Sequence, residues 1–248
     1  MLVLLKRLEV IYEDDSCIIV NKPAGLPVQG GKGIRVSLDS ILAGIWAERP
    51  LLVHRLDRDT SGIVLVAKTK TAAAWFSKLF SEADSGRNNK GNNSVSRQYL
   101  AICRGKPDKP EGTIRLDLNI RGTVKKSATH YRLLSNCNGE HGDFSMLELE
   151  LRTGRMHQIR RHLALTGNPV LGDDKYGDFT LNRYLRKTMQ LRYLLLHASR
   201  LLIPQMPDGS RLDISAPLPD PFDNFIVQLK GLLHNSCEAA LIAGDKES

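Results

Sequence analysis

The amino-acid sequence predicts an α+β fold with a mixed, largely antiparallel β-sheet. Short stretches of alternating apolar and polar residues recur along the chain, as at residues 128–134 and 144–152, and an apolar β-branched run at 63–67 has the length of a buried strand. Helical patterns are few and do not alternate regularly with strands, which argues against a parallel α/β sheet. With 248 residues, 42% of them hydrophobic, the chain can bury one core, so we expect a single domain over residues 1–248.

Hydrophobic patterning predicts the first elements of the chain. Residues 8–15 and 17–20 predict a β-hairpin with acidic residues at its turn. The prolines and the glycine of residues 21–28 then impose an irregular but ordered segment. A helix is expected at 37–47, with an apolar face made of Leu38, Ile41, Leu42 and Ile45.

A longer helix and a polar insertion follow the strand at 63–67. Residues 84–94 contain no large apolar side chain and cannot be part of a core, so we predict a flexible insertion over about residues 84–96. Trp75, on the helix before it, is expected to pack rather than to stack on a base. Thr71 is a suitable cap for that helix, whose apolar face recurs at Ala72, Phe76, Leu79, Phe80 and Ala83.

The rest of the chain predicts further strands and two helices. In the strand at 97–103, Tyr99 and Ala101 lie on one face. His197, inside an apolar run, is expected to be a core histidine. The other predicted elements are a short strand at 113–118, strands at 128–134 and 144–152 joined by a loop at 136–142, a helix between Gly154 and Gly167 that buries Met156, Ile159 and Leu163, a strand at 211–216, and a C-terminal helical face made of Phe222, Phe225, Ile226, Leu229, Leu232 and Leu233.

The charge of the chain indicates a polyanionic partner. A net charge of +8 and a pI near 9.4 favour a polyanion such as a nucleic acid, because lysine and arginine that neutralise phosphates release condensed counterions. No stretch approaches the roughly 18 apolar residues of a membrane span, and the short apolar run at the N-terminus is too short for the core of a signal peptide. We therefore expect a cytoplasmic protein with no membrane partner.

Cysteines and histidines give no indication of a metal. The four cysteines are scattered without a Cys-x-x-Cys spacing, which is typical of reduced, structural thiols. His157 and His162 lie five positions apart and do not form the i, i+4 pair that binds zinc on a helix face. We predict no metal site.

Residues 54–62 crowd ionisable and hydroxyl side chains into a loop before a predicted buried strand. Loops at the end of a rigid strand often carry chemistry, although a turn with solvated charges is the alternative. Asp57 follows Leu56, which should point inward, and it lies between Arg55 and Arg58, cations expected to hold its carboxylate ionised. An ionised aspartate suits a nucleophile or an electrostatic stabiliser.

A second cluster is basic. Arg155, Arg160 and Arg161 crowd the start and middle of a predicted helix, where cations oppose the helix dipole, so we infer an anion from outside the helix. A solvated basic helix is the alternative. Lys125 and Lys126, ahead of a predicted strand, are expected either to contact RNA phosphate or to be solvated.

Both clusters resemble signatures of one enzyme family. His-Arg-Leu-Asp-x-x-Thr-Ser-Gly, at residues 54–62, is similar to the motif of the RluA-type pseudouridine synthases. Thr-Gly-Arg-Met-His-Gln-Ile-Arg, at 153–160, resembles a second motif of that family, with Met156 in place of a threonine. Further stretches that resemble the family, in the family's order, lie at 21–25, 167–178 and 194–198, and the resemblance extends over about residues 12–219.

The resemblance implies a pseudouridine synthase fold, a bent mixed sheet with flanking helices and a central RNA-binding cleft. It implies isomerisation of specific uridines in structured RNA to pseudouridine, with no cofactor. By resemblance, Asp57 is the catalytic residue, Tyr99 packs on the uracil, Arg160 pairs with Asp57, and Arg55 fills the space left by the flipped base. The predicted RNA-binding set is completed by Arg58, Arg155, Arg161, Lys125 and Lys126.

Other functions fit fewer of these residues. The protein-kinase loop His-Arg-Asp-Leu has a different order, and no suitably spaced asparagine follows here. A glycoside hydrolase could use Asp57 and Asp59 as an acid/base pair, but it leaves the arginine cluster unexplained. A non-catalytic RNA-binding module explains the charge but not a carboxylate at the centre of a basic cleft.

The motifs do not distinguish ribosomal from transfer RNA targets. The spacing of Tyr-Gly-Asp-Phe at 176–179 is more like the RluC- and RluD-like branch that modifies large-subunit ribosomal RNA, so 23S ribosomal RNA is the first prediction and transfer RNA the alternative. We expect a monomer with no small RNA-binding module ahead of Tyr12. Lys22 either supports the cleft, as its stretch does in the family, or is solvated.

Overall fold

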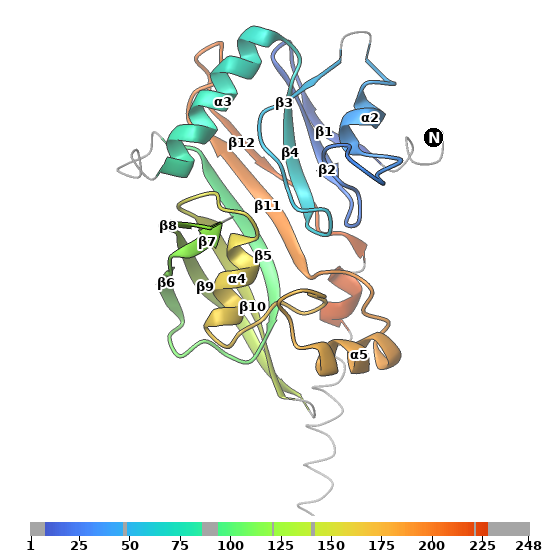
Figure 1. Cartoon of the computed structure of the whole chain (residues 1–248), viewed down its shortest axis with the longest axis vertical. Coiled ribbons are helices and arrows are strands. Elements are labelled where there is room, and N and C mark those ends of the chain that lie inside the picture. Colours follow the sequence, from blue (N-terminus) through green and yellow to red (C-terminus); the bar gives the residue numbers. More distant parts are fainter. Residues whose placement is uncertain are drawn as a thin grey trace, which may run out of the picture.

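The computed structural model describes residues 8–46, 49–85, 94–120, 122–139, 142–220 and 222–227. Its centre is a ten-stranded sheet in the order β1-β2-β4-β11-β5-β10-β9-β6, with β12 paired to β11 and β3 paired to β4 (Figure 1). The strands of this sheet are β1 (Glu9–Glu13), β2 (Cys17–Lys22), β3 (Leu51–Leu52), β4 (Ser61–Ala67), β5 (Ser96–Arg104), β6 (Glu111–Arg115), β9 (Ala128–Gly139), β10 (Gly142–Leu151), β11 (Leu196–Ile203) and β12 (Leu212–Ser215).

Four helices and a separate hairpin complete the named elements. The helices are α2 (Leu38–Leu42), α3 (Lys70–Ser85), α4 (Gln158–Leu165) and α5 (Phe179–Thr188), and the hairpin is β7 (Leu118–Ile120) with β8 (Thr123–Lys125). In the part of the chain that the structure describes, no helix has the length and the apolar character needed to cross a bilayer. Most of the predicted insertion, residues 86–93, and the predicted helical positions from 229 to 233 lie outside the described residues.

The described strand pairs confirm the predicted α+β class. The strands of the large sheet pair antiparallel, except that β4 and β11 are parallel. The hairpins predicted for β1–β2 and β9–β10 are both present.

Alternation along the central strands divides the core into layers. In β4, Val64 and Val66 belong to the layer under α2 and α4, whereas Ile63 and Leu65 belong to the layer under α3. Because both faces of β4 are covered, this strand is apolar without interruption. A third layer lies under α5 and includes Phe222.

The start of α3 differs from the prediction. Thr69, and not Thr71, caps the helix, since its Oγ1 accepts a hydrogen bond from the Ala72 amide at 3.1 Å. The apolar residues predicted for the buried face of α3 all pack in the core beneath this helix. Trp75 does not pack in the core: it stays partly exposed and donates its indole N–H to the Gln205 carbonyl at 3.2 Å.

Two apolar residues predicted to be buried are exposed because their helices are shorter than predicted. Ile45 is exposed because α2 ends at Leu42, and Met156 is exposed because α4 begins only at Gln158. The predicted strand at 113–118 is also divided, since β6 ends before Leu118 begins β7.

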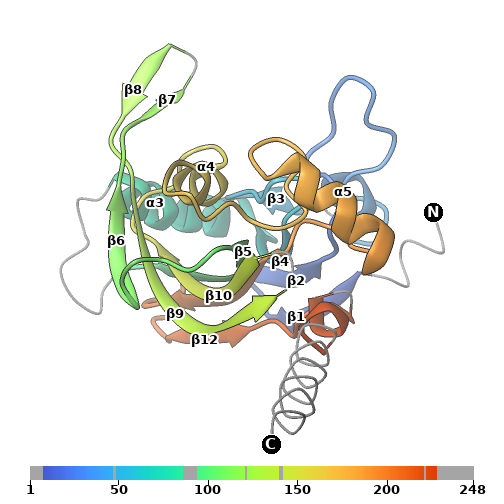
Figure 2. The same cartoon turned by 90° about the horizontal axis from the view of Figure 1, so that it is seen from below.

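The β7–β8 hairpin projects from the molecule beside α4 (Figure 2). Helix α4 holds its base: Arg161 Nη1 donates to the Asn119 carbonyl at 3.1 Å, and the fully buried His162 has its Nε2 2.8 Å from Ser127 Oγ and 3.1 Å from the Leu116 carbonyl. The hairpin is therefore attached to the helix that carries the second sequence motif.

The parallel contact between β4 and β11 requires a glycine. Ser61 and Gly62 pair with His197 and Ala198. Gly62 has φ +108°, which L-amino acids rarely adopt, and a Cβ atom there would lie 2.2 Å from the Ala198 carbonyl oxygen. The last residue of the polar cluster is thus a glycine because two backbones meet there.

We expect Gly62→Ala to lower the free energy of unfolding by more than about 3 kcal/mol, because it adds a clash with rigid backbone to an unfavourable φ. Gly209→Ala is the matched control: its φ is +86° but its Cβ would meet nothing within 4 Å, so only about 1 kcal/mol should be lost. Urea unfolding followed by circular dichroism measures both. Equal losses in the two variants would contradict the close-approach argument.

Candidate active site

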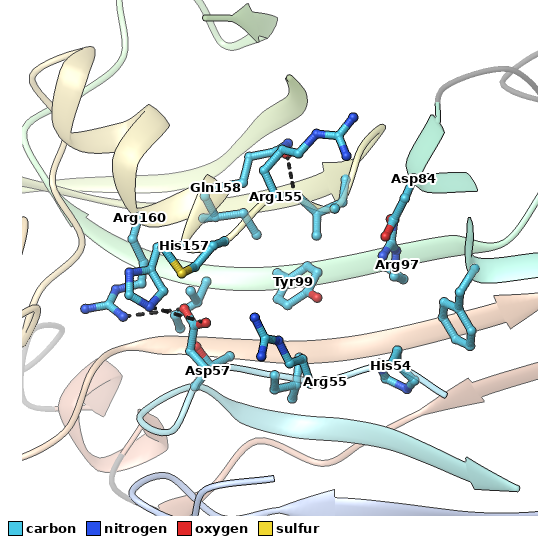
Figure 3. Close-up of a pocket in the computed structure, with 18 of the residues that line it drawn as sticks. His54, Arg55, Asp57, Asp84, Arg97, Tyr99, Arg155, His157, Gln158 and Arg160 are labelled. Carbon is cyan, nitrogen blue, oxygen red and sulfur yellow. Dashed lines mark hydrogen bonds and ion pairs between the residues drawn. The ribbon is translucent and has the colours of Figure 1, made fainter. Parts of the chain in front are cut away.

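A pocket of about 610 Å³ lies where the β3–β4 loop, the start of α4 and the end of α3 meet over β5 (Figure 3). Residues 54–57 line one side, and residues 154–160 line the other. Tyr99, from β5, lies between them. The fold therefore joins the two polar clusters of the sequence in one site.

The β3–β4 loop presents Asp57 to the pocket by burying its neighbours. Leu56 packs into the core, as predicted, and Thr60 is buried, whereas the Asp57 side chain remains 25% exposed. A carboxylate in this position is mostly withdrawn from solvent and still open to a ligand.

Lys22 supports the same loop from below. Its side chain is fully buried, and its Nζ donates to the carbonyl oxygens of Arg58, Leu26 and Pro23 at 3.0, 2.9 and 3.0 Å. Burial lowers the pKa of Lys22 to about 7, an effect that nearby carboxylates offset in part. A solvated Lys22, one of the two predicted alternatives, is wrong, because all three of its N–H donors are used inside the protein.

Arg160 is the ionic centre of the site. Its Nε and Nη2 donate to the two oxygens of Asp173 at 2.7 and 2.8 Å, and its Nη1 lies 3.4 Å from Asp57 Oδ2. Asp173 also accepts hydrogen bonds from the amides of Lys175 and Tyr176. Burial alone would raise the pKa of Asp173, but these hydrogen bonds outweigh it and hold the pKa below its ordinary value.

The negative charges next to Arg160 are carboxylates of the protein itself, those of Asp57 and Asp173. Arg160 is buried, and its charge is balanced by Asp173 and Asp57, so the inference of an external anion at this arginine is wrong. The physical reason is that a buried guanidinium is tolerated only beside buried carboxylates. Arg155, by contrast, lines the pocket and donates its Nε to the Lys126 carbonyl at 3.3 Å.

His157 is a second neighbour of Asp57. It caps α4 in the left-handed conformation, with φ +53°, which is unusual for a residue other than glycine. This conformation brings Nε2 to 3.6 Å from Asp57 Oδ1 and Nδ1 to 3.0 Å from the Tyr176 hydroxyl. Burial lowers the pKa of His157, against the opposing effect of Asp57, so the imidazole is a neutral partner at pH 7.

Tyr99 and Arg55 face each other across the pocket. Tyr99 is buried, and burial raises its pKa to about 12, so the phenol stays protonated. Arg55 is exposed on the rim, and its guanidinium points toward Tyr99 (Figure 3). The two side chains leave between them a space bounded by an aromatic ring and an exposed cation.

The far wall of the pocket is a stack of three side chains. His54 lies on Phe80 with ring centroids 4.4 Å apart, and Arg97 lies over the same ring while donating its Nη2 to Asp84 at 2.6 Å. His54 Nε2 accepts from the Leu65 amide at 2.8 Å, and burial lowers the pKa of this histidine to about 3. His54 is therefore a neutral, fixed part of the wall.

Four predicted RNA-binding residues lie outside the pocket. Arg58 is 71% exposed and donates its Nε to the Gly25 carbonyl, so it does not balance Asp57 as predicted. The cation beside Asp57 is Arg160. The other three residues, Arg161, Lys125 and Lys126, belong to α4 and to the β7–β8 hairpin and its base.

The geometry does not support an acid/base pair of aspartates. Asp59 is exposed, lies 4.0 Å from Arg58 and does not line the pocket, whereas Asp57 does. Within the described residues, no group of three or more histidine, cysteine or acidic side chains is arranged to hold a metal ion. Of these two aspartates, only Asp57 lines the pocket, with Arg160 beside it.

Asp173, Tyr176, Asp84, Arg97 and the position of His157 beside Asp57 were not predicted as parts of the site. Asp173 lies in a stretch that resembles the family, which was the available signal, but its partner is 13 positions away across a helix. His157 lies within the second motif, but no pattern predicts its left-handed backbone.

Sequence comparison connects this site with known enzymes. Residues 16–165 match the family model described as RNA pseudouridylate synthase. Ribosomal large subunit pseudouridine synthase C of Rickettsia bellii is 34% identical over 228 residues, which cover 86% of this chain and 69% of that protein. The mitochondrial RNA pseudouridine synthase 4 of Arabidopsis thaliana is 37% identical over 195 residues, which cover 68% of this chain and 40% of that protein.

Solved structures agree with the sequence comparison. The human RNA pseudouridylate synthase domain containing 4 superposes with a TM-score of 0.73 at 25% identity, and the match covers 92% of this chain and 96% of that one. A second human protein, RNA pseudouridylate synthase domain containing 1, superposes with a TM-score of 0.66, also at 25% identity. This match covers 87% of this chain and 85% of that one. The chain therefore belongs to the RNA pseudouridylate synthase family and is, as its two motifs predicted, an RNA pseudouridine synthase.

Proposed function

We propose that this enzyme isomerises uridines of large-subunit ribosomal RNA, with Asp57 as the catalytic nucleophile. The observation that carries the proposal is the position of Asp57, which lies in the pocket 3.4 Å from the buried Arg160 and near Tyr99. The ribosomal target is supported by the Rickettsia relative, whose name assigns it to the large ribosomal subunit, and by the net charge of +8. On this proposal the enzyme acts in the cytoplasm as a monomer.

The reaction is an isomerisation, so the protein has mainly to position the uridine and Asp57. It breaks the N1–C1′ bond of a uridine and joins C5 to C1′, while C5 loses a proton and N1 gains one, so no electrons are gained or lost overall. The target base must first leave its stack to reach the pocket. Arg55, exposed on the rim, is placed to occupy the vacated space.

Inside the pocket each residue has a separate task. Tyr99 provides an uncharged ring on which the uracil packs, because its phenol keeps its proton. Arg160 orients one oxygen of Asp57, and the other oxygen lies near His157. A carboxylate that Arg160 orients loses little freedom when it attacks, which lowers the barrier.

Site mapping of pseudouridine in total RNA tests the substrate. If the proposal is correct, one or a few positions in the large-subunit ribosomal RNA lose their carbodiimide-dependent primer stops when the gene is deleted, and the wild-type gene restores them. Loss of sites in transfer RNA alone would instead identify the alternative target. Complementation with Asp57→Asn should restore none.

Asp57→Asn should lower the turnover of purified enzyme at least about a thousandfold, because it removes the nucleophile. RNA affinity should be kept or improved, since a negative charge is removed from a basic surface. Asp59→Asn is the neighbouring control and should resemble the wild type, because Asp59 lies outside the pocket. Tritium release and filter binding measure the two effects, and equal losses of turnover would support the acid/base pair instead.

Asp173→Asn should destabilise the protein by about 3–5 kcal/mol at pH 7, because it leaves Arg160 buried without its main partner. The pKa of Asp173 is lowered in the folded protein, so its stabilising contribution is present above the unfolded value of about 4 and is lost as the pH falls through the folded value. Urea unfolding at pH 7, 5 and 3.5 should therefore show a difference from the wild type that narrows below about pH 4.

Asp174→Asn is the control for Asp173→Asn. Asp174 is the next residue, is 77% exposed and pairs with Arg186 on the surface, so its loss should cost less than about 1 kcal/mol. A similar cost for both variants would contradict the central role of the buried pair.

A further inference from the structure

A surface beside the pocket combines exposed aromatic rings with unpaired cations. We call it the α5 surface and define it as Phe179, Arg183, Tyr184, Lys187, Arg192 and Tyr193. Four phenylalanine, tyrosine or tryptophan side chains are clearly exposed in the described chain, and three of them belong to this surface, at 57% for Phe179, 38% for Tyr184 and 45% for Tyr193.

Helix α5 packs against the core without using these aromatic side chains. Leu181 and Leu185 are buried against the core layer that contains Phe222 and Phe225, so the helix already has its packing face. The exposed rings are not members of that layer, although Tyr193 lines a pocket beside its Phe225. Exposed aromatic side chains cost solvation free energy, and they are typical of surfaces that bind a partner.

The charges of this region leave a positive excess. Two carboxylates that flank the start of α5 are already paired, Asp178 with Arg104 and Asp174 with Arg186. Among the described residues, no ion pair joins the three cations of the α5 surface to a carboxylate. The surface therefore presents rings and positive charge together, the combination that binds unpaired nucleotides by stacking and by phosphate contact.

The α5 surface is rigidly attached to the active site. The buried Asn182 accepts a hydrogen bond from the Gly172 amide at 2.9 Å and donates one to the Asp173 carbonyl at 3.0 Å, so α5 is held by the loop that binds Arg160. At the other end of the segment, the Tyr193 carbonyl packs against Gly172 so closely that a Cβ there would meet it at 2.0 Å.

Chain distance places one end of this surface, Phe179, close to the pocket. Tyr176 binds His157 in the pocket, and Phe179 follows three residues later, which limits the separation of their Cα atoms to about 11 Å. Helices α4 and α5 and the β7–β8 hairpin rise on the same side of the molecule (Figure 2). An RNA strand that leaves the pocket on this side would pass within reach of α5.

We infer that the α5 surface binds nucleotides that flank the target uridine, with its rings stacked on unpaired bases and its cations on phosphates. The inference rests on the proposed function and adds to it a recognition surface outside the catalytic pocket. Double-stranded RNA offers no exposed base faces, so the surface should favour target sites whose neighbours are unpaired. It should affect affinity and target choice and leave the chemical step alone.

The first test compares two matched double variants. Phe179→Ala/Arg183→Gln removes one ring and one cation from the α5 surface, and Trp75→Ala/Lys78→Gln removes the same from the exposed side of α3. The substrate is tritium-labelled total RNA from cells that lack the gene, which contains the natural target whatever its class. We expect the α5 variant to raise KM about tenfold or more with kcat unchanged, and the α3 control to change neither.

A second variant, Tyr193→Ala/Arg192→Gln, tests the other end of the surface and should behave like the first. Circular dichroism and thermal unfolding establish that each variant is folded. The salt dependence of RNA binding should become less steep in both α5 variants, because each loses a phosphate contact. A KM like that of the wild type in both folded variants would overturn the inference.

Photochemical cross-linking gives a readout that does not depend on turnover. RNA that carries 4-thiouridine should cross-link to the peptide that contains residues 179–193. Turnover by the wild type without this cross-link would contradict the α5 inference and leave the proposed function intact. Absence of turnover in the wild type would contradict the proposed function, while the cross-link would still decide whether α5 binds RNA.

Discussion

The buried ion pair between Arg160 and Asp173 determines the form of the active site. Withdrawing two charges from water is costly unless each is fully hydrogen-bonded, and here the planar guanidinium meets the carboxylate with two parallel bonds of 2.7 and 2.8 Å. The pair leaves the Nη1 group of Arg160 for Asp57, and Asp173 also accepts a hydrogen bond from the amide of Tyr176. The positions of the proposed nucleophile and of the ring that orients His157 thus follow from one interaction.

Strand order explains how distant motifs reach this pair. Asp57 and Arg160 are 103 positions apart, yet β4 lies beside β11, which lies beside β5 and then β10. The first motif ends at Ser61 and Gly62, and the row of Ser61 runs across the sheet through His197 and Leu100 to Glu148. Because β10 ends only three residues after Glu148, the second motif, which follows β10, comes close to the first. The parallel contact through Gly62 and Ala198 allows this order, and the buried hydrogen bond of 2.9 Å between Ser61 and His197 lies beside it.

The charged groups inside the pocket have a different role from the charged groups on the surface around it. Inside, Arg160 is consumed by carboxylates, while His54 and His157 are neutral because burial lowers their pKa. The part of the pocket next to Asp57 and Arg160 therefore offers little attraction to phosphate and suits an uncharged base, whereas Arg155 adds a positive charge elsewhere in the lining. Attraction for a polyanion is left to exposed cations on the rim, such as Arg55, and to the surfaces that project around it. This arrangement lets a negatively charged Asp57 lie at the centre of a basic protein.

Sequence alone determined the fold class, most of the strands, the two motifs and five residues of the pocket, namely Arg55, Asp57, Tyr99, Arg155 and Arg160. These features could be predicted because alternation, apolar runs and motif spacing are local properties of the chain. Apart from the contact of Arg160 with Asp57, which the resemblance implied, only the tertiary structure decided which charged groups pair. Asp173 as the partner of Arg160, the buried amine of Lys22 and the distance of Arg58 from Asp57 all depend on which segments meet in space. Charges in a low-dielectric interior choose partners by proximity in the fold, and no spacing along the chain records that choice.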